Sequence, residues 1–175
     1  MVVAEATVAS DRVAAAWRVL RDVMDPEIPV LSIVDLGIVR FVREERSGED
    51  SEATLHVGLA PTYSGCPATE VIRGSVERAL ARAGFARVKI ENVLSPPWTS
   101  EWVTAEGRRK LLAFGIAPPQ EPVSSPRRLF GETTVHCPRC GSEATERISE
   151  FGSTPCKAHY RCTECLEPFD YFKCI

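Results

Sequence analysis

Four of the seven cysteines form two C-x-x-C pairs near the C-terminus. The pairs are Cys137-Pro-Arg-Cys140 and Cys162-Thr-Glu-Cys165, they are separated by 21 residues, and Gly141 directly follows the first. A C-x-x-C turn points both sulfurs at one centre, so two such turns supply the four sulfurs of a tetrahedral metal site. The spacing slightly exceeds the usual range, which indicates a ribbon with a longer hairpin. We expect structural zinc, with a single iron as the alternative.

Cys66 lies far from the other six cysteines and directly precedes Pro67. Proline is favoured at the first position of a helix, so this pattern predicts Cys66 as a helix N-cap. A sulfur there faces the positive end of the helix dipole, which favours the thiolate. Cysteine is a poor cap compared with serine or aspartate, so we expect a chemical role, with an inert cap as the alternative.

The remaining cysteines and nearby histidines have simpler interpretations. Cys156 is expected to be a small buried hydrophobe and Cys174 a terminal thiol, and a second metal-handling pair is the alternative. His136 and His159 are expected to be solvated or hydrogen-bonded, because four cysteines already complete a zinc site.

Three carboxylates, Asp25, Glu27 and Asp35, lie around a proline-stiffened loop and a predicted strand. Their spacing alone does not make an acid–base pair. The sequence has no phosphate-binding loop and no Ser-His-Asp set. Cys66 also lacks a clear partner base, which disfavours nucleophilic catalysis.

Composition narrows the class of protein. The chain has 175 residues, 44% hydrophobic and 26% charged, with a formal net charge of -3. It therefore lacks the basic excess that binds a phosphate backbone, and no run approaches the roughly 18 apolar residues that span a membrane. The N-terminal residues do not resemble a signal peptide, so with functional thiols we expect a cytoplasmic protein.

Hydrophobic periodicity predicts the elements that position these groups. In chain order they are a helix, two strands, a helix, a strand and a short helix, at 11–24, 33–42, 53–59, 67–83, 87–94 and 100–114, with a polar turn at 47–50. This order, α-β-β-α-β-α, predicts an α+β fold. We expect a compact mixed-sheet α/β domain over 1–116, a Pro/Ser-rich linker over 117–130 and a four-cysteine metal ribbon over 131–175.

Several motifs together resemble known families. The segments are Asp25-Pro-Glu27-Ile-Pro29, Asp35-Leu-Gly37 and Pro61-Thr62 followed by Gly65-Cys66-Pro67. Over about residues 12–94 they resemble the iron–sulfur assembly domain of SufT-type proteins and of some Mrp-type P-loop scaffold proteins. With the segment from Pro96 to Trp102 and the cysteine-rich tail, the whole chain resembles the D-subunit family of bacterial phenylacetyl-CoA epoxidase (ring-oxygenase) systems.

This resemblance implies an accessory protein rather than a catalyst on its own. Its implied partners are the di-iron oxygenase and the flavin and [2Fe–2S] reductase of that system, together with iron–sulfur assembly proteins; a homodimer is left open. Cys66 would be the cluster-handling thiol, and Asp35 and Thr62 match motif positions that shape its site. One thiolate cannot hold a cluster that takes about four sulfur ligands, so the cargo, iron or a cluster, would be transient and shared.

A second hypothesis of a different class is an integral structural or electron-transfer component of the oxygenase complex. A rubredoxin-like iron in the ribbon would favour it. A nucleic-acid-binding ribbon protein is a third hypothesis, which the net charge disfavours.

Overall fold

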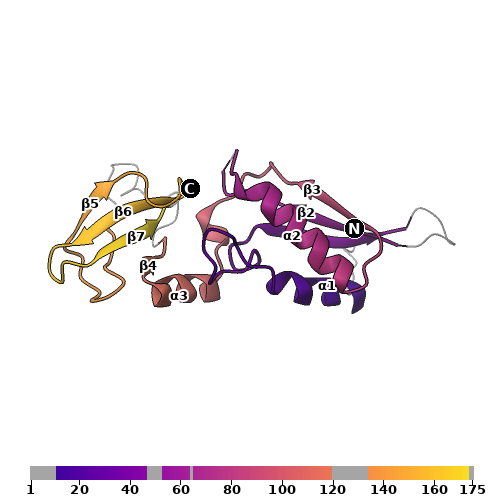
Figure 1. The fold of residues 1–175 in the computed structure, drawn as a ribbon, viewed down its shortest axis with the longest axis horizontal. Helices are drawn as coiled ribbons and strands as arrows, with labels where there is room; N and C mark the ends of the chain where they lie inside the picture. Colours follow the sequence, from indigo (N-terminus) through magenta and orange to yellow (C-terminus); the bar gives the residue numbers. More distant parts are fainter. Residues whose placement is uncertain (1–10, 47–52, 64, 120–133, 174–175) are drawn as a thin grey trace, which may run out of the picture.

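The structure is a computed structural model that describes residues 11–46, 53–63, 65–119 and 134–173. The predicted turn at 47–50, most of the predicted linker and Cys174 lie outside the described residues. The predicted order α-β-β-α-β-α is confirmed for the N-terminal part, and a second, four-stranded sheet follows. In Figure 1 the two sheets lie side by side along the long axis of the molecule.

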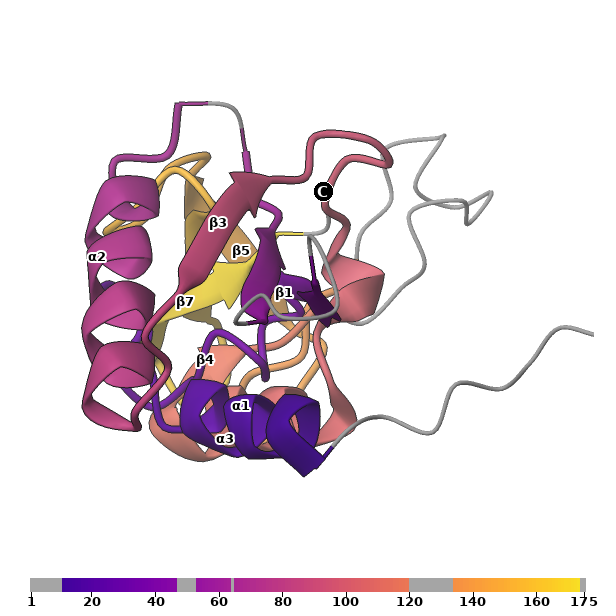
Figure 2. The ribbon, with the colours of Figure 1, turned by 90° about the vertical axis from the view of Figure 1, so that its right-hand side faces the viewer.

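The first sheet has the order β1-β2-β3. Its strands are β1 (Val39–Glu45), β2 (Thr54–Leu59) and β3 (Val88–Asn92), with β2 antiparallel to β1 and parallel to β3. Helix α1 (Asp11–Arg21) contacts β1, helix α2 (Ala68–Arg82) contacts β3, and the two helices contact each other. Figure 2 shows both helices against this sheet. Leu55 and Val57 of the central strand lie on one face of the sheet, where both are fully buried.

The strand predicted at 33–42 begins only at Val39, so its first half was wrongly predicted. Local hydrogen bonds hold these residues in turns instead: the Ser32 amide donates to Asp35 Oδ2, and the Asp35 amide donates to Ser32 Oγ, both at 3.0 Å. Such side-chain bonds compete with a sheet ladder. Gly37 then adopts a φ of 67°, and an added Cβ there would lie 2.5 Å from the Trp102 carbonyl oxygen. The turn and the chain around Trp102 therefore pack closely.

Threonine side chains cap both helices that follow β3. The N-cap of the 3-10 helix η1 (Ser100–Trp102) is Thr99, whose Oγ1 accepts from the Glu101 amide. The N-cap of helix α3 (Ala105–Phe114) is Thr104, whose Oγ1 accepts from the Gly107 amide at 2.9 Å. The predicted helix end at Phe114 is confirmed, while the α-helix starts several residues later than predicted.

The second sheet has the order β4-β7-β6-β5. Its strands are β4 (Ile116–Ala117), β5 (Thr145–Ser149), β6 (Lys157–Cys162) and β7 (Pro168–Phe172). β6 is antiparallel to both neighbours, and β4 pairs in parallel with β7. The short strand β4 thus lies beside the ribbon although it directly follows α3. The division of the chain into domains at about residue 117 stays a prediction.

The two parts of the chain share buried side chains. Cys156 and Phe172 of the ribbon belong to the same buried cluster as the core of the first sheet. The Trp98 ring meets Phe172 edge-on at 6.1 Å, and its indole Nε1 donates to the Leu36 carbonyl at 2.9 Å. Arg108 of α3 donates to the carbonyls of Ser100, Val103 and Pro119. Apolar packing and the pairing of β4 with β7 therefore join the ribbon to the first part of the chain.

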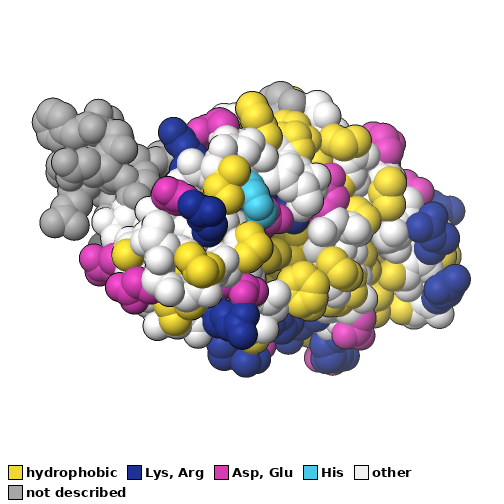
Figure 3. All heavy atoms as spheres, turned by 60° about the vertical axis from the view of Figure 1, so that its left-hand side comes forward, with side chains coloured by type: hydrophobic (Ala, Val, Ile, Leu, Met, Phe, Trp, Pro, Cys, Tyr) yellow, Lys and Arg dark blue, Asp and Glu magenta, His cyan; other side chains and the backbone are white. Residues whose placement is uncertain are grey.

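No described helix is both long enough and apolar enough to cross a membrane. On the face shown in Figure 3, basic and acidic side chains are interspersed around hydrophobic ones.

We expect Phe172→Ala to lower the free energy of unfolding by about 3–5 kcal/mol, because it removes a fully buried aromatic ring that both parts contact. Chemical denaturation of the metal-loaded protein measures the loss. Phe151→Ala is the matched control: Phe151 is 62% exposed and should change stability by at most about 0.5 kcal/mol. Equal effects of the two substitutions would contradict the shared core.

Candidate metal centre and thiol pocket

The four predicted metal cysteines come together at the end of the ribbon. Their sulfurs all lie within 4.8 Å of one another, and the pairs Cys137–Cys165 and Cys140–Cys162 are each 3.6 Å apart. A tetrahedron of sulfurs around zinc, with bonds of about 2.3 Å, has edges of about 3.8 Å. The donor set and its spacing therefore fit a tetrahedral metal ion.

The two cysteine turns have the same backbone construction. In each, the first cysteine's amide donates to the carbonyl five residues later: Cys137 to Ser142 and Cys162 to Glu167, both at 2.9 Å. The residue after each second cysteine is left-handed, with φ of 79° at Gly141 and 63° at Leu166. Glycine adopts this conformation freely, whereas for leucine it costs about 1–2 kcal/mol. The second turn therefore keeps its shape against a backbone penalty.

The four clustered thiols do not share one pKa. The amide of Cys165 donates to Cys162 Sγ at 3.4 Å, and this bond contributes most to lowering the pKa of Cys162 to about 7. At Cys140 a hydrogen bond from the backbone of Ser142 lowers the pKa of the thiol. Desolvation and the hydrogen bonds of the other three thiols outweigh it and raise this pKa to about 12. Four sulfurs this close cannot all carry charge without a cation, so a divalent ion is what would let them ionise together.

The two histidines near these cysteines are hydrogen-bonded, as expected. His136 Nδ1 lies 3.4 Å from the Gly141 carbonyl oxygen, and His159 Nδ1 lies 3.3 Å from Asp170 Oδ1.

A cavity of about 30 Å³, here called the thiol pocket, lies where the ribbon meets the first part of the chain. Its walls include the apolar side chains of Ile72 and Phe172. Its polar lining consists of Asp25, Glu27, Thr62, Cys66, Thr69 and Cys156. The pocket therefore brings together two thiols from distant parts of the chain and two carboxylates.

Cys66 enters the pocket from the start of α2. The helix begins at Ala68, and Pro67 occupies the cap position with helical φ and ψ of -65° and -23°. These bounds place Cys66 one residue before the cap position, although Pro67 is itself helical, so the predicted and observed helix starts differ by one residue at most. The Cys66 carbonyl accepts a turn bond from the Thr69 amide at 3.1 Å. The thiol is half-buried, and desolvation followed by the charge of this thiol raises the pKa of Tyr63.

Cys156 enters the same pocket from the residue before β6. It is 4% exposed, which confirms the expected burial. Its carbonyl accepts from the Lys173 amide at 3.0 Å, and its sulfur lies 3.0 Å from Thr154 Oγ1. Burial is the largest cause of the raised pKa of the Cys156 thiol; the Thr154 bond opposes it and the charge of Glu27 adds to it.

The two carboxylates lie on the loop after α1. Asp25 Oδ1 accepts from the amides of Glu27 at 2.9 Å and Ile28 at 2.7 Å, which fixes the loop. Burial raises the pKa of Asp25 despite these bonds, and burial followed by the charge of Asp25 raises the pKa of Glu27. The buried ammonium of Lys157, 3.4 Å from Asp170 Oδ2, partly offsets both shifts.

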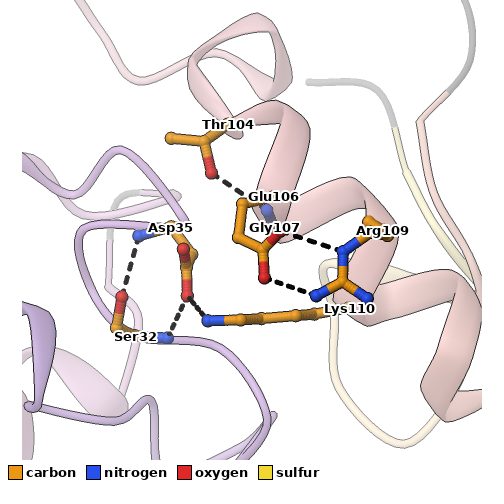
Figure 4. Close-up of polar contacts among 7 residues, drawn as sticks. All are labelled: Ser32, Asp35, Thr104, Glu106, Gly107, Arg109 and Lys110. Carbon is orange, nitrogen blue, oxygen red and sulfur yellow. Dashed lines mark hydrogen bonds and ion pairs between the residues drawn. The ribbon is translucent and has the colours of Figure 1, made fainter.

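The structure places Asp35 outside the pocket lining. Figure 4 shows its Oδ2 accepting from Lys110 Nζ of α3 at 2.7 Å and from the Ser32 amide at 3.0 Å. Burial raises the pKa of Asp35, but the Lys110 and Ser32 bonds outweigh it and the net shift is downward. This ion pair ties α3 to the turn that supplies Leu36 and Ile38 to the pocket walls. Of the three predicted cargo residues, the structure brings only Cys66 and Thr62 together.

Sequence reasoning did not group Asp25, Glu27 and Cys156 with Cys66. The Asp25–Pro29 motif could have drawn attention to the two carboxylates. Cys156 could have been recognised as buried, because it alternates along a strand pattern with Ala158, Tyr160 and Cys162, and all four are buried. Neither pattern shows that these residues line the same pocket as Cys66.

Two family models match separate segments of the chain. The family described as "Iron-sulfur cluster assembly protein" matches residues 13–91, and the "PaaD zinc beta ribbon domain" matches residues 121–173. The chain is 48% identical over 170 residues to the putative D subunit of the 1,2-phenylacetyl-CoA epoxidase of Escherichia coli, covering 97% of this chain and 98% of that one.

Two further relatives cover the N-terminal part. An "Fe-S protein maturation auxiliary factor" of Porphyromonas gingivalis is 34% identical over 95 residues, 54% of this chain and 85% of the relative. The crystal structure of a domain of unknown function from Bacillus anthracis has a TM-score of 0.51 and 24% identity, covering 57% of this chain and 91% of that one. The structural likeness supports the fold alone.

We expect Asp35→Asn to lower the free energy of unfolding at neutral pH by about 1.5–3 kcal/mol, the range for hydrogen bonds to a charged group. The carboxylate's pKa is lowered from 3.8 in the folded state, so its contribution is complete above that value and is lost as the pH falls through the folded pKa. The gap between variant and wild type should therefore close in acid.

Denaturation at a series of pH values measures this gap. Asp22→Asn, at an exposed position, is the control and should have little effect at any pH. A gap for Asp35→Asn that stays constant with pH would contradict the ion-pair account.

Proposed function

Because the chain belongs to the D-subunit family of the phenylacetyl-CoA epoxidase, we propose that it is an accessory protein that delivers iron or an iron–sulfur cluster to the oxygenase or reductase of that system in aerobic phenylacetate degradation. Two findings support this function: the near full-length relative is named as a subunit of the epoxidase, and the N-terminal part matches an iron–sulfur assembly family. The cargo is the substrate of this protein, not its resident cofactor.

The observation that carries the proposal is the position of Cys66. Its thiol is half-buried in the wall of the thiol pocket, at the start of α2, so it is held in place and still reachable. A single reachable thiolate binds soft metal ions but does not complete their coordination. Such a ligand suits transfer better than storage.

Thr62 and Asp35 have supporting roles in this proposal. The Thr62 side chain lines the pocket beside Cys66 and offers a hydroxyl to the cargo. Asp35 acts as a positioning residue, because its ion pair with Lys110 holds the turn from which Leu36 and Ile38 reach the pocket.

The ribbon cysteines Cys137, Cys140, Cys162 and Cys165 would hold a structural zinc ion. The match to a zinc ribbon family and the spacing of the four sulfurs support zinc. A ribbon of this size buries too little surface to be stable alone, so metal binding would supply much of its folding free energy.

We expect anaerobic reconstitution of the wild type to give about one zinc per chain together with bound iron, and Cys66→Ala to give the same zinc without the iron. Removing one reachable thiol leaves the core intact, so the variant should melt like the wild type. Cys137→Ala is the complementary variant: it should lose zinc and melt earlier. Iron, zinc and acid-labile sulfide per chain are the quantities to measure.

If Cys66→Ala binds as much iron as the wild type, Cys66 does not handle the cargo. The alternative, an integral component of the oxygenase complex, would then gain support, most of all if the iron disappears with Cys137→Ala. Iron in the four-cysteine site would indicate electron transfer through the ribbon.

A further inference from the structure

The hairpin of β6 and β7 connects the four-cysteine site to the thiol pocket. Its two strands run antiparallel and side by side (Figure 1), and its turn carries Cys162 and Cys165. At the open end of the hairpin, the Cys156 carbonyl accepts from the Lys173 amide at 3.0 Å, and β7 ends at Phe172. Cys156 and Phe172, here called the ribbon wall, line the thiol pocket. The metal turn and the ribbon wall are therefore opposite ends of one hairpin.

We propose that metal bound by the four ribbon cysteines sets the exposure of Cys66. With metal, the hairpin holds the ribbon wall against the pocket and Cys66 stays half-buried; when the metal is lost, the wall loosens and the thiol becomes open to solvent. This inference rests on the proposed function, in which Cys66 handles the cargo, and deepens it by naming what regulates access to that thiol.

Buried side chains along the hairpin link its two ends. The Tyr160 ring of β6 meets Tyr171 edge-on at 5.6 Å and stacks on Phe169 at 6.0 Å. These rings share one buried cluster with Cys137 and Cys162, two of the four clustered cysteines. A domain of about 40 residues usually needs a metal or disulfides to fold, so the packing of this cluster depends on the metal. Loss of the metal would therefore act along the whole hairpin.

The turn of the hairpin has little besides the metal to keep its shape. Leu166 has a φ of 63° and is 69% exposed. A leucine in this left-handed conformation is strained, and an exposed side chain gains little burial in return. Gly141 takes the corresponding place in the first cysteine turn without strain. Metal bonds at Cys162 and Cys165 would hold the strained turn in place.

Cys66 is positioned by its own part of the chain. Its amide donates to the Tyr63 carbonyl at 3.3 Å in the turn before α2, and its carbonyl accepts from the Thr69 amide. The ribbon contributes cover instead: Cys66 packs against the buried cluster to which Cys156 and Phe172 belong. A loosened ribbon wall would therefore uncover the sulfur without displacing it.

The test is the rate at which N-ethylmaleimide modifies Cys66, read from the mass of the peptide that contains it. The rate is measured on the zinc-loaded chain and after a chelator has removed the zinc. We expect modification at least about tenfold faster without zinc, as a modest gain in local opening produces. Hydrogen exchange of the β2 amides is the internal control. Leu55 and Val57 are fully buried there and should stay protected in both states.

Leu166→Gly tests the route through the hairpin turn. Glycine relieves the strain of this turn, so zinc removal should accelerate the modification of Cys66 about two- to fivefold less than in the wild type. Glu164→Ala, at an exposed position of the same turn, is the matched control and should behave like the wild type. Neither residue is one of the four clustered cysteines, so both variants should still bind zinc.

Three outcomes would overturn the inference and leave the proposed function standing. Equal rates with and without zinc would show that the cover of Cys66 does not depend on the metal. Loss of protection in β2 would show that zinc stabilises the whole chain rather than the ribbon wall. An acceleration in Leu166→Gly as large as in the wild type would exclude the hairpin turn as the link. Failure of the proposed function itself would appear separately, as iron uptake that does not depend on Cys66.

Discussion

The contact between Trp98 and Phe172 is the interaction on which the rest of the site depends. The indole donates to the Leu36 carbonyl on one side and packs its edge against the Phe172 ring on the other. Through these two contacts Trp98 joins the ribbon to the turn that forms one wall of the thiol pocket. The β4–β7 pairing and the shared buried cluster hold the same junction, so Cys156 and Cys66 line one cavity.

Polar contacts around this junction keep the walls in place. The ion pair of Asp35 with Lys110 and the three carbonyl bonds of Arg108 anchor α3, and β4 continues from that helix into the ribbon sheet. The scaffold is therefore rigid where the ligands attach, while the thiol of Cys66 stays half-exposed. That combination suits a protein that must bind its cargo in a defined geometry and then release it.

Much of this arrangement could be predicted from the sequence, and the exceptions have physical reasons. The four ribbon cysteines follow from spacing alone, because a C-x-x-C turn is local. Periodicity likewise located α1, α2 and β2. The strand predicted from Ile33 failed because Ser32 and Asp35 bond to each other's amides, which a hydrophobic pattern does not reveal. The sequence could not show that Cys156 and Cys66 line one pocket, because this depends on how two distant segments pack.

The most direct test of the central claim, that Cys66 handles the cargo apart from the metal held by the four ribbon cysteines, is iron X-ray absorption on the anaerobically reconstituted wild type and Cys66→Ala variant. The account predicts iron with sulfur neighbours in the wild type and no bound iron in the variant. Iron with an unchanged spectrum in the variant would contradict a role of Cys66, and four sulfur neighbours in both would assign the iron to the ribbon cysteines.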